Sequence, residues 1–262
     1  MRKWFAVPLV VAGLVLAGCE NPPQRAGAES ASGGHLTGTL TVFAAASLTG
    51  VFGRLGKELE KANPGLDVRF DFAGSSALAT QLTQGAPADV FASADQAQMK
   101  KVTDAGLEAQ AREIFTENVI EIAVPKGNPG HVTGLADFAE PDLTLAVCAP
   151  QVPCGAAAQK VFRAAGIDAK PDTQEEDVKA ALTKVELGEV DAALVYATDV
   201  KAAGDRVQGI PFPQAQQAVN KYPICALKAA PNPRAARAFV DLVTSGRGRQ
   251  ALEDAGFRAP TS

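Results

Sequence analysis

The stretch Thr39-Leu-Thr-Val-Phe-Ala-Ala-Ala-Ser-Leu-Thr49 opens the part of the chain that decides the fold. Residues 39–46 are mostly apolar and rich in strand-forming types, which is typical of a strand buried on both faces. Ser47 interrupts this run, and the spacing of apolar residues then predicts an amphipathic helix over 48–62, ending at Asn63-Pro64-Gly65. A buried strand that leads through a small polar residue into a helix is the unit of a parallel α/β sheet.

The same alternation continues along the rest of the chain, with predicted helices of roughly 8 to 15 residues between short strands. The pattern predicts further strands at 66–72, 88–92, 114–125, 143–148, 192–196 and 222–227. It predicts further helices at 76–84, 96–104, 155–165, 176–187, 234–244 and 248–255. The sequence is therefore that of an α/β protein, and we find no internal repeat in it.

Length and composition narrow the class of function. The 262 residues are 47% hydrophobic, enough for one large domain or for two lobes of about 100 residues each. The net charge is −4 and no basic run occurs, which argues against nucleic acid or an anionic lipid surface as a partner. His35 and His131 are the only histidines in the sequence, so a histidine-based metal site or catalytic triad is not expected.

The first residues have the features of an export signal. Met1-Arg2-Lys3 gives a positive start, and an apolar stretch too short to span a bilayer comfortably follows to Leu16. The ending Leu16-Ala-Gly-Cys19 resembles a bacterial lipobox, which implies a signal peptide at 1–18, cleavage before Cys19 and a lipid on its thiol. The alternative is a soluble export signal with a coincidental cysteine. Residues 19–38 are rich in Pro, Gly and Ser and are predicted to be a flexible tether on the outer face of the cell membrane.

Four predicted junctions between a strand and a helix carry small or polar residues: Ala46-Ser47-Leu48, Gly74-Ser75-Ser76, Pro153-Cys154-Gly155 and Glu176-Asp177-Val178. In open parallel sheets, ligands bind at the carboxyl ends of the strands, where the helices begin. Each helix start offers unpaired N–H groups and about half a positive charge. Several such starts would bind an anion without lysine or arginine. Ordinary N-capping by these serines is the simpler alternative.

Three longer segments then identify a family resemblance: Thr41-Val-Phe-Ala-Ala-Ala-Ser-Leu-Thr49, Phe72-Ala-Gly-Ser-Ser-Ala-Leu-Ala79 and Gly85-Ala-Pro-Ala-Asp-Val-Phe-Ala-Ser-Ala-Asp95. Together with 122–127, 152–155, 176–178 and 195–196, they resemble the periplasmic molybdate-binding proteins of ABC importers over roughly residues 39–258. The resemblance implies a type II periplasmic-binding-protein fold with a ligand cleft between two α/β lobes. It places lobe 1 at 39–118 plus 228–262 and lobe 2 at 119–227. The two hinge crossings are expected near 117–125 and near 222–228.

The resemblance also implies a ligand set. Ser47 and Ser75 would each give a hydroxyl and an N–H, Cys154 and Val178 would give backbone N–H groups, and Tyr196 would give its phenol. A pocket of donors suits a fully ionised dianion such as molybdate or tungstate, whereas phosphate near neutral pH keeps a proton that would stay unpaired. Sulfate would have to be rejected by size, so a binding protein for sulfate or another tetrahedral oxyanion is the alternative. The implied partners are an ABC permease and its ATPase subunits. No cofactor is implied, and we expect a monomer.

The cysteines leave two pairings open. With Cys19 lipidated, three cysteines remain in an oxidising compartment. A bridge between Cys148 and Cys154 would close a short loop, stabilise the fold by roughly 2 kcal/mol and stiffen the turn before Cys154. Cys148 with Cys225 is the alternative if their strands adjoin.

An enzyme is not expected. Cys154 as a nucleophile would need a base, for which the folded part offers only His131. Ser47 and Ser75 lack the sequence contexts of known serine nucleophiles. Asp89 and Asp95 flank a strand end, where capping of a turn is the simpler role than cation binding. The acidic Glu175, Glu176 and Asp177 would oppose a bound dianion, and we expect them to face solvent and favour the helix dipole instead.

Overall fold

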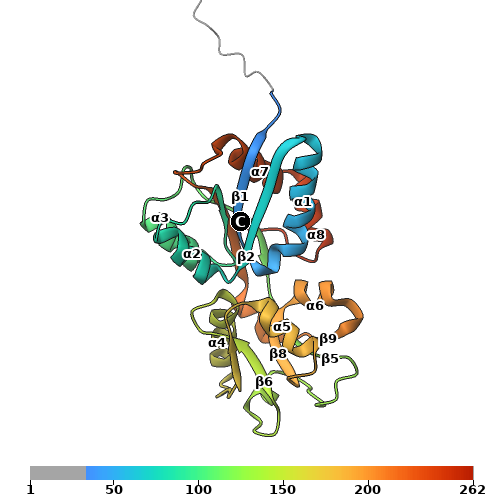
Figure 1. The fold of residues 1–262 in the computed structure, drawn as a ribbon. Coiled ribbons are helices and arrows are strands. Elements are labelled where there is room, and N and C mark those ends of the chain that lie inside the picture. Colours follow the sequence, from blue (N-terminus) through green and yellow to red (C-terminus); the bar gives the residue numbers. More distant parts are fainter. Residues whose placement is uncertain (1–33, 262) are drawn as a thin grey trace, which may run out of the picture. The chain divides into compact units, whose positions relative to one another are not determined.

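The computed structural model describes residues 34–261 of the chain. Residues from His35 onward form one compact unit with two five-stranded sheets, here called lobe 1 and lobe 2 (Figure 1). The predicted α/β class is confirmed. The predicted signal peptide and the lipid site at Cys19 lie outside the described residues. Across residues 34–261, no helix combines the length and the apolar character needed to cross a membrane.

Lobe 1 is built on a mixed sheet with the strand order β2-β1-β3-β10-β4. Strand β1 runs parallel to β2 and β3, whereas β10 runs antiparallel to β3 and β4. Its strands are β1 (Thr37–Ala45), β2 (Gly65–Ala73), β3 (Val90–Ala92), β4 (Glu113–Asn118) and β10 (Asn220–Ala226). Its helices are α1 (Thr49–Ala62), α2 (Ser75–Thr83), α3 (Gln96–Asp104), α7 (Pro233–Thr244) and α8 (Gly246–Asp254).

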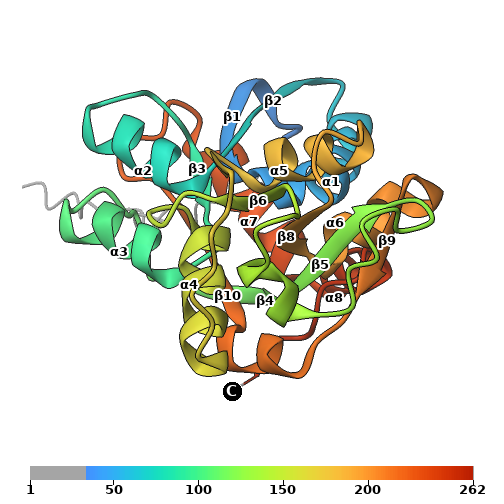
Figure 2. The same cartoon turned by 90° about the horizontal axis from the view of Figure 1, so that it is seen from below.

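Both faces of the lobe 1 sheet are covered by helices. Because side chains alternate along a strand, Leu40 and Val42 of β1 pack with α1, α7 and α8, while Phe43 packs with α2 and α3. The two groups of helices lie on opposite sides of the sheet (Figure 2). This double cover explains why the strand reads as an almost continuous apolar run in the sequence.

Lobe 2 is built on a second mixed sheet with the strand order β7-β6-β8-β5-β9. Strand β6 runs parallel to β7 and β8, and β5 runs antiparallel to β8 and β9. Its strands are β5 (Ile120–Pro125), β6 (Leu145–Cys148), β7 (Thr173–Glu175), β8 (Ala192–Tyr196) and β9 (Val207–Ile210). Its helices are α4 (Pro153–Ala165), α5 (Val178–Glu186) and α6 (Ala197–Ala203), and 3₁₀ turns lie at Leu135–Ala139, Gly204–Arg206 and Pro213–Ala218.

The second hinge crossing differs from the prediction. The first crossing lies at Val119, between β4 of lobe 1 and β5 of lobe 2, inside the predicted range. The second lies at Val219, because β10 pairs with β3 and β4 and so belongs to lobe 1. The expectation that residues 220–227 belong to lobe 2, with a crossing near 222–228, is therefore wrong.

Smaller differences concern short elements. Strands β7 and β9 and helix α6 were not predicted, and each is only three to seven residues long. Thr37 and Gly38, expected at the end of the tether, are the first residues of β1 and pair with Gly65 and Leu66. Pairing with a neighbouring strand, rather than local composition, decides where β1 begins.

Candidate functional site

A small cavity lies between the lobes, where the carboxyl ends of the parallel strands of both sheets meet. Its cavity volume is about 10 Å³. All five residues predicted to hold the ligand line it, namely Ser47, Ser75, Cys154, Val178 and Tyr196. The structure therefore brings together residues that are spread over 150 positions of the sequence.

Ser75 is the first residue of α2, and its side chain is almost fully buried. Its Oγ accepts a hydrogen bond of 3.0 Å from the backbone N–H of Ala94. Since this contact uses a lone pair, the hydroxyl hydrogen of Ser75 remains free to be donated into the cavity. The N–H at the first position of a helix likewise has no intrahelical acceptor. Ser75 thus offers two donors.

Ser47 lies in a 3₁₀ turn, Ala46–Leu48, that leads directly from β1 into α1. Its Oγ is 3.0 Å from the hydroxyl of Tyr222 on β10. The simpler alternative, that Ser47 and Ser75 serve as N-caps, does not apply, since neither hydroxyl accepts from the N–H groups of the helix that follows. The two serines face the cavity instead of their own helices.

Cys154 and Val178 line the cavity from lobe 2. Cys154 is the second residue of α4, and Val178 is the first residue of α5. The predicted disulfide between Cys148 and Cys154 is confirmed, and Cys225 is a buried free thiol. The bridge ties the first turn of α4 to the end of β6. A side chain at Gly155 would overlap the carbonyl oxygens of Cys148 and Ala149, so this tight approach requires glycine.

Tyr196 ends β8 and is 1% exposed. Among the described residues its hydroxyl has no hydrogen-bond partner. An unpaired buried hydroxyl costs about 1–3 kcal/mol, which is rarely tolerated without a function. Burial raises the pKa of Tyr196 well above its usual value, so the phenol keeps the proton that it would donate.

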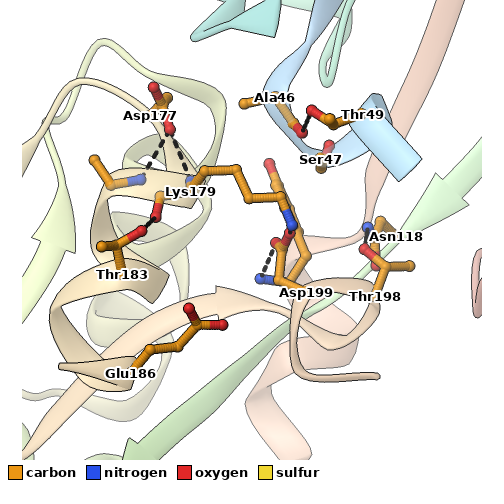
Figure 3. A network of polar contacts seen from close by, with 12 residues as sticks. Ala46, Ser47, Thr49, Asn118, Asp177, Lys179, Thr183, Glu186, Thr198 and Asp199 are labelled. Atoms are coloured by element: carbon orange, nitrogen blue, oxygen red, sulfur yellow. Dashed lines mark hydrogen bonds and ion pairs between the residues drawn. The ribbon is translucent and has the colours of Figure 1, made fainter. Parts of the chain in front are cut away.

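Of the three acidic residues expected to face solvent at the start of α5, only Glu176 is exposed, whereas Asp177 lines the cavity. The Asp177 carboxylate caps the helix by accepting from the N–H groups of Lys179 and Ala180 at 2.7 and 3.0 Å (Figure 3). Glu175 pairs with Lys184 at 2.7 Å, and Glu176 is exposed. The negative charge next to Val178 is therefore used by the helix and by a neighbouring lysine.

An ion pair between Lys179 and Asp199 lies next to two of the predicted site residues, Val178 and Tyr196. The Asp199 carboxylate, on α6, lies 2.8 Å from Lys179 Nζ on α5 (Figure 3). Its other oxygen accepts a hydrogen bond of 3.1 Å from the backbone N–H of Tyr196. The sequence reading missed this pair because α6 is too short for a periodic pattern. An acidic residue three positions after a strand end was the available signal.

Cys154, Asp89 and Asp95 each have a structural role in the part of the chain that the structure describes. Cys154 is in a disulfide and so is no thiolate nucleophile. Asp95 caps α3, and Asp89 accepts from the N–H groups of Thr41 and Asn232 at 2.7 and 2.6 Å. In this part of the chain, no group of three or more His, Cys, Asp or Glu residues is placed to hold a metal ion. The aspartates have the structural roles that were predicted.

Two polar residues of the hinge strands, Asn118 and Tyr222, were not predicted as part of the site. Both are buried, and Tyr222 contacts Ser47 directly. An asparagine inside the long β-type run 114–125, and one of only two tyrosines in the chain, were the available signals.

Comparisons with known proteins find relatives that match most of this chain. A family model described as bacterial extracellular solute-binding protein matches residues 40–258. The molybdate-binding protein ModA of Mycobacterium tuberculosis is 44% identical over 252 residues, covering 96% of this chain and 95% of the relative.

Solved structures give the same fold. The periplasmic molybdate-binding protein of Azotobacter vinelandii superposes with a TM-score of 0.72 at 20% identity, covering 85% of this chain and 100% of that one. The sulfate-binding protein SubI of M. tuberculosis also gives 0.72, at 16% identity, covering 84% and 86%. At these sequence identities the two structures show the fold alone and do not identify which oxyanion this chain binds.

Proposed function

The chain belongs to the family of bacterial extracellular solute-binding proteins, and on this basis we propose that it captures molybdate in the cavity between its lobes for delivery to an ABC importer. The family is one of binding proteins, in agreement with the expectation that the chain is not an enzyme. The proposed ligand contacts are the hydroxyls and N–H groups of Ser47 and Ser75, the N–H groups of Cys154 and Val178, and the Tyr196 phenol.

The unpartnered Tyr196 hydroxyl is the observation that carries the proposal most directly. It lines a cavity whose other polar groups are helix starts and the hydroxyls of Ser47 and Ser75. Ser75 Oγ already accepts a hydrogen bond from the N–H of Ala94, and Ser47 Oγ is hydrogen-bonded to Tyr222. No lysine or arginine lines this cavity, and its one acidic residue, Asp177, is engaged as a helix cap. Such a set of donors is complementary to an ion that has acceptors only.

Selectivity follows from the same chemistry. A fully ionised tetrahedral dianion is satisfied by donors alone, so molybdate and tungstate are expected to bind comparably. Phosphate near neutral pH would bury an unpaired proton, at a cost of about 1–3 kcal/mol, or roughly 5- to 150-fold in affinity. Sulfate is also a fully ionised dianion, so the site can exclude it only by its smaller size.

Isothermal titration of the purified protein with molybdate, tungstate, sulfate and phosphate tests the proposal. We expect tight binding of the first two and much weaker binding of the others. Tight sulfate binding would replace molybdate by another tetrahedral oxyanion as the ligand. Silence with all four ions would contradict the proposal.

We further propose that the protein is anchored through a lipid on Cys19 at the extracytoplasmic face of the cell membrane and acts there as a monomer. The lipobox-like Leu16-Ala-Gly-Cys19 supports the anchor. Its partners would be the permease and the ATPase subunits of the importer. Cys19→Ala should move the protein from the membrane fraction to the soluble fraction without changing molybdate affinity, and a variant that stays membrane-bound would contradict the anchor.

A further inference from the structure

Next to Ser47, residues close to the two hinge crossings form a chain of side-chain hydrogen bonds. Asn118, at the end of β4, accepts the backbone N–H of Val119 with its Oδ1 at 3.0 Å. Its Nδ2 must therefore donate, and it reaches Thr198 Oγ1 at 2.8 Å and the Tyr222 hydroxyl at 3.5 Å. Figure 3 shows Asn118 beside Thr198, next to the turn that carries Ser47.

Tyr222 lies in the core of lobe 1 and contacts Ser47 at the edge of the cavity. It is fully buried, and its ring makes edge-on contacts with Phe115, Tyr196 and Phe257 at centroid distances of 5.5–6.4 Å. Its oxygen accepts from Asn118 Nδ2 and lies 3.0 Å from Ser47 Oγ, a contact in which either hydroxyl can be the donor. Burial raises the pKa of Tyr222, so its phenol keeps its proton.

The orientation of the Ser47 hydroxyl depends on this contact. When Tyr222 donates to Ser47 Oγ, the Ser47 hydrogen is free to be donated into the cavity. Asn118 favours this arrangement, because the Tyr222 oxygen already accepts a hydrogen bond from it. The Ser75 hydroxyl is also left as a donor, because its Oγ accepts the backbone N–H of Ala94. No side-chain substitution removes that N–H. The direction of the Ser47 hydroxyl, in contrast, depends on two side chains.

We propose that Asn118 and Tyr222 are positioning residues that fix Ser47 as a hydrogen-bond donor and thereby make the site reject oxyanions that carry a proton. The inference rests on the proposed function, and it assigns the discrimination between molybdate and phosphate to residues that do not touch the ligand. Without the Tyr222 hydroxyl, Ser47 can rotate and accept the proton of hydrogenphosphate. The penalty against that ion then falls.

The test is Tyr222→Phe, which keeps the ring and its aromatic contacts. Molybdate, sulfate and phosphate affinities are measured near neutral pH by calorimetry, with displacement of molybdate for the weaker ions. We expect the ratio of molybdate to phosphate affinity to fall about tenfold, within the roughly 5- to 150-fold range of an unpaired buried group. The ratio of molybdate to sulfate should stay unchanged, because neither ion carries a proton.

A double-mutant cycle separates this role from a structural one. In a Ser47→Ala background, Tyr222→Phe should no longer change the ratio of molybdate to phosphate. Tyr196→Phe is the matched control, because it removes a donor for every ion and should leave both ratios near those of the wild type. If Tyr222→Phe fails to fold, Asn118→Ala replaces it, with a smaller change in the same direction expected from its longer contact.

The outcomes distinguish the two proposals. Molybdate binding by the wild type with an unchanged ratio to phosphate in Tyr222→Phe overturns the positioning role alone. A parallel loss for all three ions also overturns it, since that is the result of a merely structural role. A wild type that does not bind molybdate overturns the proposed function and this inference together.

Discussion

Within the described residues, the Tyr196 hydroxyl is buried without a partner, so its removal should affect stability and binding in opposite ways. Tyr196→Phe removes an unsatisfied polar atom, and the free energy of unfolding without molybdate should stay the same or rise by up to about 1 kcal/mol. Molybdate affinity should fall roughly 10- to 150-fold, because a hydrogen bond to a charged group contributes about 1.5–3 kcal/mol. Urea unfolding and calorimetry measure the two effects.

Ser75→Ala is the natural comparison, because its hydroxyl has a second task. It leaves the buried N–H of Ala94 without an acceptor, so stability should fall together with affinity. A Tyr196→Phe variant that loses stability as Ser75→Ala does would contradict the assignment of its hydroxyl to the ligand.

Single residues were predicted from the sequence where a motif or a helix start marks them. Ser47, Ser75, Cys154 and Val178 lie at strand-to-helix junctions, and Tyr196 came from the family resemblance alone. Tyr222 could not be placed in the same way. Its relation to Ser47 spans 175 positions, and it depends on which strands become neighbours in the sheet.

Among the elements, α5 and α6 depend on the buried contact between Lys179 and Asp199. The Asp199 side chain is 1% exposed and that of Lys179 is 35% exposed, so Lys179 can partly rehydrate when its partner is lost. Asp199→Ala should therefore lower the free energy of unfolding by roughly 2–3 kcal/mol, somewhat less than for a fully buried pair. It should also weaken molybdate binding, because the Tyr196 N–H loses its acceptor.

The surface pair between Lys100 and Asp104 is the control for this prediction. Both of its side chains are more than 60% exposed, so Lys100→Ala should change the free energy of unfolding by at most about 0.5 kcal/mol. Equal losses for the two variants in urea unfolding would show that burial of Asp199 contributes nothing.

Glu117, on strand β4, has a shifted pKa that should make the stability of the protein depend on pH. Burial tends to raise the pKa of Glu117, but hydrogen bonds from Thr261 and the nearby Lys221 outweigh it, so the pKa is lowered below 4.5. The contact fastens the end of the chain to β4, with Glu117 Oε1 2.9 Å from the Thr261 nitrogen.

A carboxylate with a lowered pKa stabilises the fold above its unfolded value and loses this contribution as the pH falls through its folded value. Stability of the wild type should therefore drop faster below about pH 5 than that of Glu117→Gln. Urea unfolding between pH 3 and 7 checks this, with Glu113→Gln, an exposed position of the same strand, as the control. Identical pH profiles for the wild type and Glu117→Gln would contradict the prediction.

The order of elements was predictable from periodicity, whereas their assignment to lobes was only partly so. The apolar run that became β10 has the composition of a buried strand in either sheet. Its antiparallel pairing with β3 and β4 places it in lobe 1, and this pairing leaves no local mark in the sequence. Short elements such as β7 and α6 fall below the length at which a period can be seen.

For the whole molecule, function as proposed requires the lobes to approach each other around the ion. The contacts that join them include the following pair beside the cavity. Gln98 on α3 donates from its Nε2 to the carbonyl oxygen of Gln151 at 3.0 Å. Gly74, before α2, lies so close to Glu176 of lobe 2 that a Cβ on Gly74 would overlap the Glu176 carbonyl oxygen.

Gly74→Ala should therefore impair closure while leaving each lobe intact. The backbone of Gly74, at φ −59° and ψ 131°, suits alanine, so the substitution causes no strain within lobe 1. Overpacking costs about 1–3 kcal/mol and arises only when the lobes meet, so molybdate affinity should fall roughly 5- to 150-fold. Thermal unfolding without molybdate should stay near that of the wild type, and the compaction seen by solution scattering on molybdate addition should shrink.

Gly53→Ala, on α1 where no atom lies within 4 Å of the added Cβ, should change neither affinity nor compaction. Wild-type affinity in Gly74→Ala would mean that the ion is held without this approach of the lobes.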